Sequence, residues 1–87
     1  MINLVFYTNC QYCGLDYFIK KHINNIETKH IENYSLIKNK KQIPIDILQQ
    51  AHIFIYQPIH EKHGIYSTAT NIENNIMSYL SPNCKII

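Results

Sequence analysis

Two apolar runs stand out along the chain. Residues 2–7 read Ile-Asn-Leu-Val-Phe-Tyr, and residues 51–56 read Ala-His-Ile-Phe-Ile-Tyr. Such near-continuous hydrophobicity over a short length is typical of strands that are covered on both faces of a sheet. We therefore predict that these two segments are the central strands of the fold.

Two weaker patterns predict further strands. Residues 29–37 are expected to hold one, with Ile31 and either Tyr34 or Leu36 facing the core. Residues 84–87 are expected to begin another.

Apolar residues at helical spacing predict helices between these strands. The first helix follows Gly14 and ends at Asn24-Asn25, and its apolar face comprises Leu15, Phe18, Ile19, His22 and Ile23. A second helix is predicted from Thr70-x-x-Glu73, which resembles a capping box. Its apolar stripe would be Ile72, Ile76, Met77 and Leu80, and Ser81-Pro82-Asn83 would close it. After a polar turn at Lys38–Gln42, Pro44 permits a short helical turn through Leu48.

Strands and helices that alternate in this way predict an α/β fold, in which helices flank a parallel sheet. Right-handed crossovers and the two strong runs predict the strand order 2-1-3-4, with residues 2–7 and 52–56 adjacent. The last predicted strand has no helix after it, although a parallel sheet normally has both faces covered. We therefore interpret residues 1–87 as the N-terminal part of a single domain, whose open sheet edge could support self-association.

Composition narrows the classes of function. The chain is 46% hydrophobic and 16% charged, as expected for a folded domain, and its net charge is only +2. All eight basic residues are lysines, so the forked arginine donors that suit nucleic acids are missing and no nucleic-acid partner is predicted. No run approaches the roughly 18 apolar residues of a membrane span. Three cysteines, an odd number, and no visible signal peptide favour the cytoplasm.

The candidate chemistry lies where the two strong strands end. Cys10 follows the first strand and precedes a helix, where a thiolate is favoured over a thiol. Gln57 follows residues 51–56, and its amide could donate a hydrogen bond to an oxyanion or simply cap the strand. The loops at the ends of neighbouring parallel strands are where α/β folds place their active sites.

Two other patterns have competing interpretations. Cys10-Gln11-Tyr12-Cys13 is a C-x-x-C motif between a strand and a helix, as in glutaredoxin-like thiol–disulfide oxidoreductases. That fold, however, also needs a proline-led strand and an antiparallel hairpin with a Gly-Gly turn, and the chain has only two glycines. His60-x-x-His63 has the spacing of a metal pair but lies between Pro58 and Gly64, so we interpret both as surface histidines and predict no metal site.

Four segments together carry a family resemblance: Asn9-Cys10-Gln11, residues 51–59, Tyr66-Ser67-Thr68 and residues 80–87. In these segments the chain resembles the polysaccharide biosynthesis enzymes named for WcbI. Members begin with a strand that ends in Asn-Cys-Gln and carry a later strand that ends in Tyr-Gln-Pro. This chain departs from their pattern at Thr8, where glycine is usual, and at His52, where an acidic residue is usual.

The resemblance implies a flavodoxin-like sandwich similar to that of SGNH/GDSL hydrolases and a role in assembling capsule or other surface glycans. It implies coenzyme A or acetyl-coenzyme A as the cofactor, and residues 1–87 as the N-terminal part of a WcbI-like domain. Cys10 would replace the serine nucleophile, and Gln57 would lie near the oxyanion hole. Asn9, Gln11, Tyr56, Tyr66 and Ser67 would bind the substrate or cofactor.

Three hypotheses follow. The first is a cysteine-dependent acyl- or acetyltransferase, whose partners are a small-molecule thioester and a sugar. The second is a glutaredoxin-like oxidoreductase that uses Cys10 and Cys13. The third is a non-catalytic binding fragment.

Overall fold

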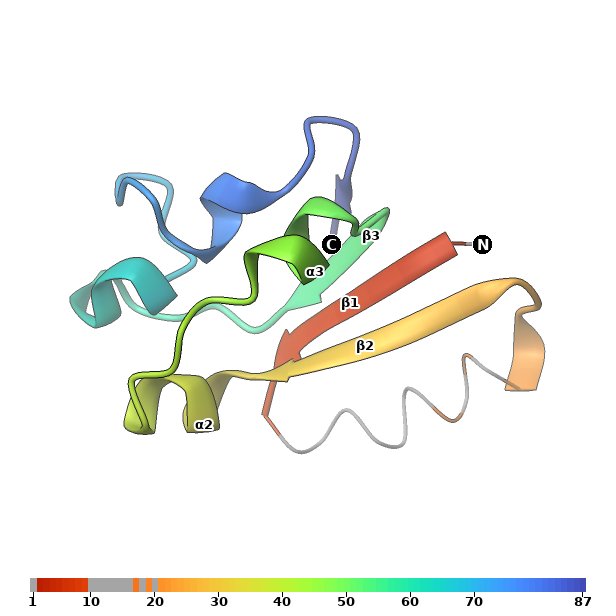
Figure 1. The fold of residues 1–87 in the computed structure, drawn as a ribbon, viewed down its shortest axis with the longest axis horizontal. Coiled ribbons are helices and arrows are strands. Elements are labelled where there is room, and N and C mark those ends of the chain that lie inside the picture. Colours follow the sequence, from red (N-terminus) through yellow and green to blue (C-terminus); the bar gives the residue numbers. More distant parts are fainter. Residues whose placement is uncertain (1, 10–16, 18, 20) are drawn as a thin grey trace.

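The computed structural model describes residues 2–9, 17, 19 and 21–87. Within these residues, four parallel strands form one sheet in the order β2-β1-β3-β4 (Figure 1). The strands are β1 (Ile2–Thr8), β2 (Ile26–Glu32), β3 (Ile53–Tyr56) and β4 (Lys85–Ile86). This is the predicted strand order, and it is the order of flavodoxin-like α/β folds.

Short helices connect the strands. They are α2 (Asn33–Lys38), α3 (Ile45–Gln49) and the 3-10 helices η1 (Glu61–Tyr66) and η2 (Ile76–Tyr79). Before β2, His22 is helical and the Ile23 N–H donates to the Ile19 carbonyl over 2.9 Å, so the helical period predicted for this segment is present where the structure describes it. The next residues end the helix as predicted, because Asn25 adopts a left-handed φ of 60°. None of the helices in the described ranges has the length and apolar character that a bilayer span requires.

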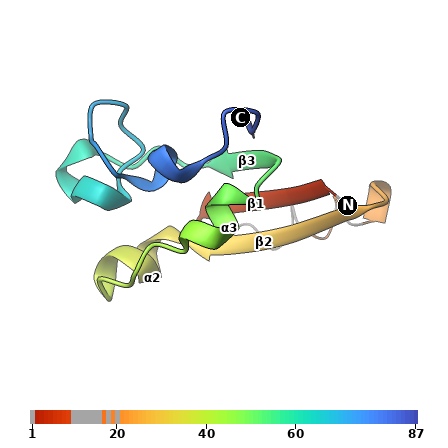
Figure 2. The same cartoon turned by 45° about the horizontal axis from the view of Figure 1, so that its top comes forward.

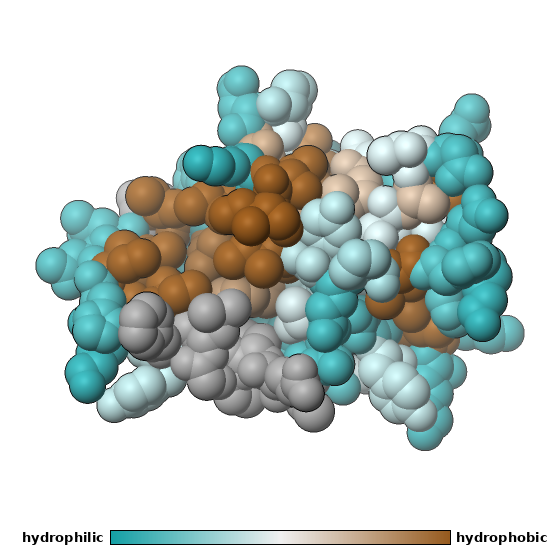
Figure 3. Space-filling view, turned by 180° about the vertical axis from the view of Figure 1, so that it is seen from behind, coloured by the Kyte–Doolittle hydropathy of each residue, from teal (hydrophilic) through white to brown (hydrophobic). Residues whose placement is uncertain are grey.

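Successive side chains of β1 point to opposite faces of the sheet, and residues on both faces are buried, which explains the continuous hydrophobicity of this strand. Val5 and Tyr7 point to the face that packs against α3 and η2, and they join Phe54 in the main core. Leu4 and Phe6 point to the other face, and both are buried as well. Figure 3 shows the molecule from behind, where a broad apolar area is visible. A strand buried on both faces is what the run at residues 2–7 predicts.

The second strand lies earlier in the chain than predicted. β2 pairs along the whole of β1, from Ile2 with Ile26 to Thr8 with Glu32, so the ladder ends before residue 33. The chain then turns into α2 within the segment that we expected to be extended. Ile31 and Leu36 are both buried, as the pattern suggested, but Leu36 enters the core from a helix and Tyr34 is 63% exposed.

The helix predicted from Thr70 and Glu73 is wrong. Residues 70–75 form turns, and only the short η2 follows. The buried Asn75 carboxamide donates to the Ser67 carbonyl at 2.9 Å and to the Ala69 carbonyl at 2.7 Å, which closes the loop on itself. Asn74 adopts a left-handed φ of 58°, which interrupts helical geometry. The loop after β3 also differs from expectation, because it contains η1.

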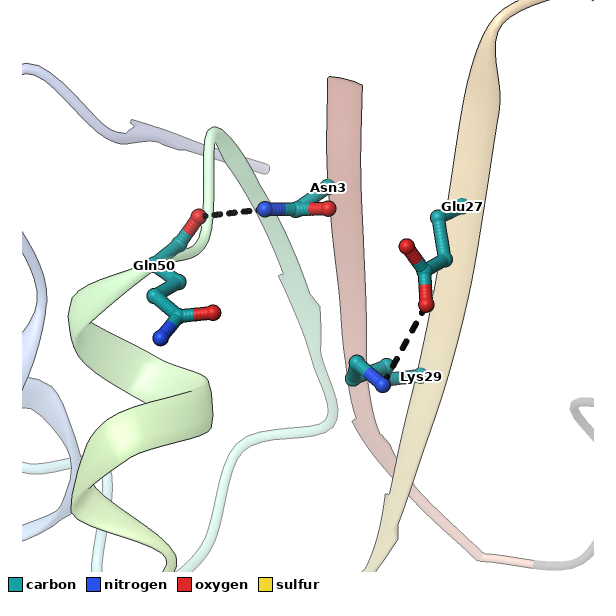
Figure 4. A network of polar contacts seen from close by, with 4 residues as sticks. All are labelled: Asn3, Glu27, Lys29 and Gln50. Atoms are coloured by element: carbon teal, nitrogen blue, oxygen red, sulfur yellow. Dashed lines mark hydrogen bonds and ion pairs between the residues drawn. The ribbon is translucent and has the colours of Figure 1, made fainter. Parts of the chain in front are cut away.

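Asn3 makes two hydrogen bonds near the amino-terminal ends of the strands. Asn3 Nδ2 donates to the Gln50 carbonyl at the end of α3 over 3.1 Å (Figure 4), and the Asn3 N–H donates to His52 Nδ1 over 2.8 Å. On β2, Lys29 pairs with Glu27 at 3.3 Å, but both side chains are about half exposed and such pairs contribute little. The Asn3 contacts therefore fix β1 against the segment that leads into β3.

Candidate functional site at the carboxyl edge of the sheet

The candidate site lies between the ends of β1 and β3, the neighbouring central strands. The strand order reverses at this point, and flavodoxin-like folds bind their ligands in the crevice that the reversal creates. The Gln57 N–H donates to the Tyr7 carbonyl over 3.0 Å, which extends the ladder one residue beyond β3. This pairing brings Gln57 beside the segment that leaves β1.

The Gln57 carboxamide bridges all three strand ends. Its Oε1 accepts one hydrogen bond from the Asn9 N–H at 2.7 Å and another from Asn33 Nδ2 at 3.2 Å. A backbone N–H can only donate, so this contact fixes which amide atom of Gln57 faces Asn9. Nε2 is consequently turned away from both donors, and it makes no hydrogen bond with the described part of the chain. Among the described residues, the two N–H donors of Gln57 Nε2 are therefore left for a ligand.

The buried side chain of Asn33 helps to fix the orientation of the Gln57 amide. Asn33 is the first residue of α2, directly after β2, and only 5% of its surface is exposed. A buried amide without partners would be costly, and the hydrogen bond to Gln57 offsets this cost. Sequence reasoning missed Asn33 because the pattern placed it inside a strand. The signal that could have found it is a polar residue directly after a strand, as in Asn9 and Gln57.

His30 is a second residue that the sequence did not single out. It lies on β2 opposite Phe6, and its Nε2 is 3.1 Å from the Thr8 carbonyl oxygen and 3.2 Å from Thr8 Oγ1. The ring therefore sits against the last residue of β1. These contacts hold the end of β1 from the side opposite to Gln57.

The proposed nucleophile, Cys10, lies outside the described residues, as do Gln11 and Cys13. Their roles stay predictions. What the structure describes is the anchor next to them, because Asn9 directly precedes Cys10 and its N–H is held by Gln57. Of the other predicted site residues, Asn9 and Gln57 are therefore brought together.

Tyr66 and Ser67 lie farther along the chain and make structural hydrogen bonds. The Tyr66 carbonyl accepts a hydrogen bond from the buried Tyr7 hydroxyl at 2.6 Å, and the Tyr66 hydroxyl donates to the Lys41 carbonyl at 2.7 Å. Burial raises the pKa of the Tyr7 phenol above its ordinary value, and the nearby Tyr66 raises it further. Tyr7 therefore stays protonated and serves as a donor that ties β1 to the end of η1.

Ser67 is fully buried, and its hydroxyl already has two partners. Oγ donates to the Ile59 carbonyl at 3.0 Å and accepts from the Ala69 N–H at 2.9 Å. Tyr56 is partly buried, and its ring stacks on Phe54 with centroids 5.8 Å apart. The structure thus gives Tyr66 and Ser67 roles in shaping the loop after β3, whereas Tyr56 precedes Gln57 at the strand end.

A groove opens next to the amide cluster. It has a volume of about 490 Å³ and is lined by Asn33, Tyr34, Ile37, Lys38, Ile59 and His63. Figures 1 and 2 show α2 and η1 side by side at this end of the sheet. Asn33 belongs both to the groove and to the contact with Gln57, so the two features are continuous.

The histidines of the His60-x-x-His63 pattern have separate roles. His60 Nδ1 accepts from the Lys62 N–H at 3.0 Å and caps η1, while His63 lines the groove. In the part of the chain that the structure describes, no group of three or more potential ligands could hold a metal ion.

No family model, curated protein or solved structure matches this chain. The features that bear on its function are the sheet order and the residues at the carboxyl edge. There, two uncharged amides and a main-chain N–H form a fixed frame around the segment that leads to Cys10. Such a frame can orient a polarised carbonyl group and can position a nucleophile from the adjoining loop.

Proposed function

We propose that this chain is a polysaccharide biosynthesis protein that transfers an acyl group, such as acetyl, from a thioester to a sugar by way of Cys10. The observation that supports the proposal most directly is the 2.7 Å hydrogen bond from the Asn9 N–H to Gln57 Oε1. It holds the residue before Cys10 at the reversal point of a flavodoxin-like sheet. The resemblance to WcbI-like proteins supplies the substrate class.

The proposed transfer has two steps. The Cys10 thiolate attacks the carbonyl carbon of the thioester, forming a new S–C bond as the bond to the donor sulfur breaks and the donor leaves as a thiolate. A sugar hydroxyl then attacks the acyl-cysteine, forming an ester and releasing the Cys10 thiolate. The hydroxyl proton ends on the departed donor thiol. Gln57 Nε2 is the proposed donor to the oxyanion that develops in each step.

Coenzyme A is the proposed carrier of the acyl group, as the resemblance implies. Asn9, Asn33 and Gln57 carry no charge, so this cluster fits the thioester end of such a donor and not its phosphates. Gln57 Nε2, which has no partner among the described residues, offers the polar contact that a thioester carbonyl requires. The residues described at this edge are assigned no further part in holding coenzyme A.

The redox alternative receives less support. A thioredoxin-like fold contains an antiparallel hairpin, whereas every strand pairing in the described part of the chain is parallel. As part of the proposal we place the protein in the cytoplasm, because a nucleophilic thiolate there is protected from oxidation.

The proposal is tested by incubating the protein with acetyl-coenzyme A and locating any acetyl group by peptide mass spectrometry. We expect an acetylated Cys10 and released coenzyme A. Cys10→Ser should abolish this labelling, whereas Cys13→Ala should retain most of it. Gln57→Glu provides a sharper variant, because a carboxylate still accepts from Asn9 and Asn33 but lacks the Nε2 donor. It should keep the fold and slow acetylation about 10²–10³-fold, as loss of an oxyanion donor does elsewhere.

Two results would contradict the proposal. One is acetylation of Cys84 at the same rate as Cys10, which would indicate unselective thiol chemistry. The other is exchange of glutathione disulfide that is lost on changing either Cys10 or Cys13, which would favour the glutaredoxin-like reading.

A further inference from the structure

The groove between α2 and η1 has the volume of a small-molecule site. Its volume of about 490 Å³ lies within the range of about 300–1,000 Å³ that is usual for such sites. Asn33, which lines the groove, also donates to Gln57 Oε1 over 3.2 Å. The groove is therefore one residue away from the Gln57 amide that accepts from the Asn9 N–H.

The wall formed by α2 combines an aromatic ring with a cation. Tyr34 and Lys38 are one helical turn apart, and Lys38 Nζ lies 5.6 Å from the centroid of the Tyr34 ring. Tyr34 is 63% exposed, so much of the ring is accessible. The C–H face of a pyranose packs well on such a ring, while hydroxyl groups require the kind of polar partners that Asn33 and His63 provide.

Among the described residues, the lining of the groove includes a basic residue and no acidic one. Lys38 contributes an ammonium and His63 an imidazole, and none of the residues described as lining the groove is acidic. Lys38 is exposed and solvated by water, and a carboxylate or phosphate in the groove would pair with its ammonium group, whereas a neutral sugar would not. Charge-assisted hydrogen bonds of this kind are stronger than those between neutral groups.

We propose that this groove binds the acceptor, and that the acceptor is a sugar carrying a carboxylate or phosphate group. This inference rests on the proposed acyl transfer, since it names the acceptor of that reaction. Tyr34 carries the sugar ring, Lys38 pairs with the anionic group, and Asn33 marks the side of the groove that faces Gln57. The sugar hydroxyl that becomes acylated lies at the Asn33 side.

The proposal is tested by NMR titration of the protein with D-glucuronate, glucose 1-phosphate and glucose. We expect the amide signals of Tyr34, Lys38 and His63 to shift, with at least one anionic sugar binding about tenfold more tightly than glucose. Binding of only one anion identifies the charged group of the acceptor. Lys38→Gln should remove the preference for anions, and the matched variant Lys41→Gln, a lysine outside the groove, should keep it.

Sugar binding is measured without catalysis, so its outcome is separate from that of the acyl-transfer test. Cys10→Ser should bind the anionic sugar as the unmodified protein does, even if no acetyl group is transferred. Equal affinity for glucose and both anions would overturn the proposal. So would displacement of bound glucuronate by coenzyme A, because the groove would then belong to the donor.

Discussion

The Gln57 side chain shows how one amide can organise a site and remain available to a ligand. Oε1 accepts from Asn9 and Asn33, and this double contact orients Nε2. Replacing the amide with an apolar side chain of similar length would remove the acceptor from two donors at once. Because unsatisfied polar groups are costly in a partly buried position, the effect on stability should be measurable.

We therefore expect Gln57→Met to lower the free energy of unfolding by about 1–3 kcal/mol. Gln57→Glu should lose much less, because a carboxylate keeps both hydrogen bonds. Urea unfolding followed by circular dichroism measures both values. Equal losses in the two variants would show that the acceptor role of Gln57 does not stabilise the fold.

The cysteines offer a second test at the level of single residues. Burial raises the pKa of the Cys84 thiol above its ordinary value, so less of it is thiolate at neutral pH. Cys10, at the end of a strand and before a helix, is predicted to have a lowered pKa instead. Iodoacetamide at pH 7 should therefore modify Cys10 faster than Cys84.

The alkylation rates of the two thiols should also depend differently on pH. Alkylation of Cys84 should therefore keep rising with pH beyond the ordinary thiol pKa of about 8.5, whereas that of Cys10 should level off below it. Peptide mapping after timed reaction at several pH values measures both rates, with Cys84→Ser as the control for peptide assignment. Parallel pH profiles for the two thiols would refute a special environment at Cys10.

Among the secondary-structure elements, the strands were more predictable than the helices. β1 and β3 could be predicted because β1 is buried on both faces and β3 has no exposed residue, which leaves few polar positions in their sequences. The bounds of β2 were predicted wrongly because half-buried residues alternate with exposed polar ones along it. No glycine or proline and no side-chain cap marks the point between Glu32 and Asn33 where the strand ends and α2 begins. The helix expected after Thr70 failed because the decisive contacts of Asn75 are tertiary, and a capping pattern does not reveal them.

Ile72, which precedes η2, and Ile76, its first residue, provide a direct test of this difference. Ile72 and Ile76 would share a face in the helix that the sequence predicts, but in the structure Ile76 is fully buried and Ile72 is only partly so. Ile76→Ala should cost about 2–5 kcal/mol of unfolding free energy, as core truncations do. Ile72→Ala should cost less than half as much. Similar losses at the two positions would favour the continuous helix.

For the whole molecule, the sheet order could be predicted while much of the site could not. The order 2-1-3-4 follows from the two strongest apolar runs and from right-handed crossovers, which depend on features that the sequence displays directly. The proximity of Asn9 to Gln57 followed from that order. Asn33, His30 and the groove did not, because they depend on where β2 ends and on how α2 packs against η1.

The sheet order also predicts how stability is distributed. β1 has a strand on each side and buried residues on both faces, so its amide hydrogens should exchange only when the whole molecule unfolds. β4 lies at the end of the described sheet, comprises two residues and is exposed at both, so it should open locally. β3 should be intermediate, because it joins the two.

Native-state hydrogen exchange in low concentrations of urea measures these differences. The exchange free energies of the Val5, Phe6 and Tyr7 amides should fall with urea at the slope of global unfolding, because their opening exposes the core. That of Ile87, whose N–H donates to the Phe54 carbonyl at 2.9 Å beside β4, should be small and nearly independent of urea. If the Ile87 amide were as protected as those of β1 and equally sensitive to urea, β4 would belong to the cooperative core. The outer part of the sheet would then be more stable than its short pairing with β3 implies.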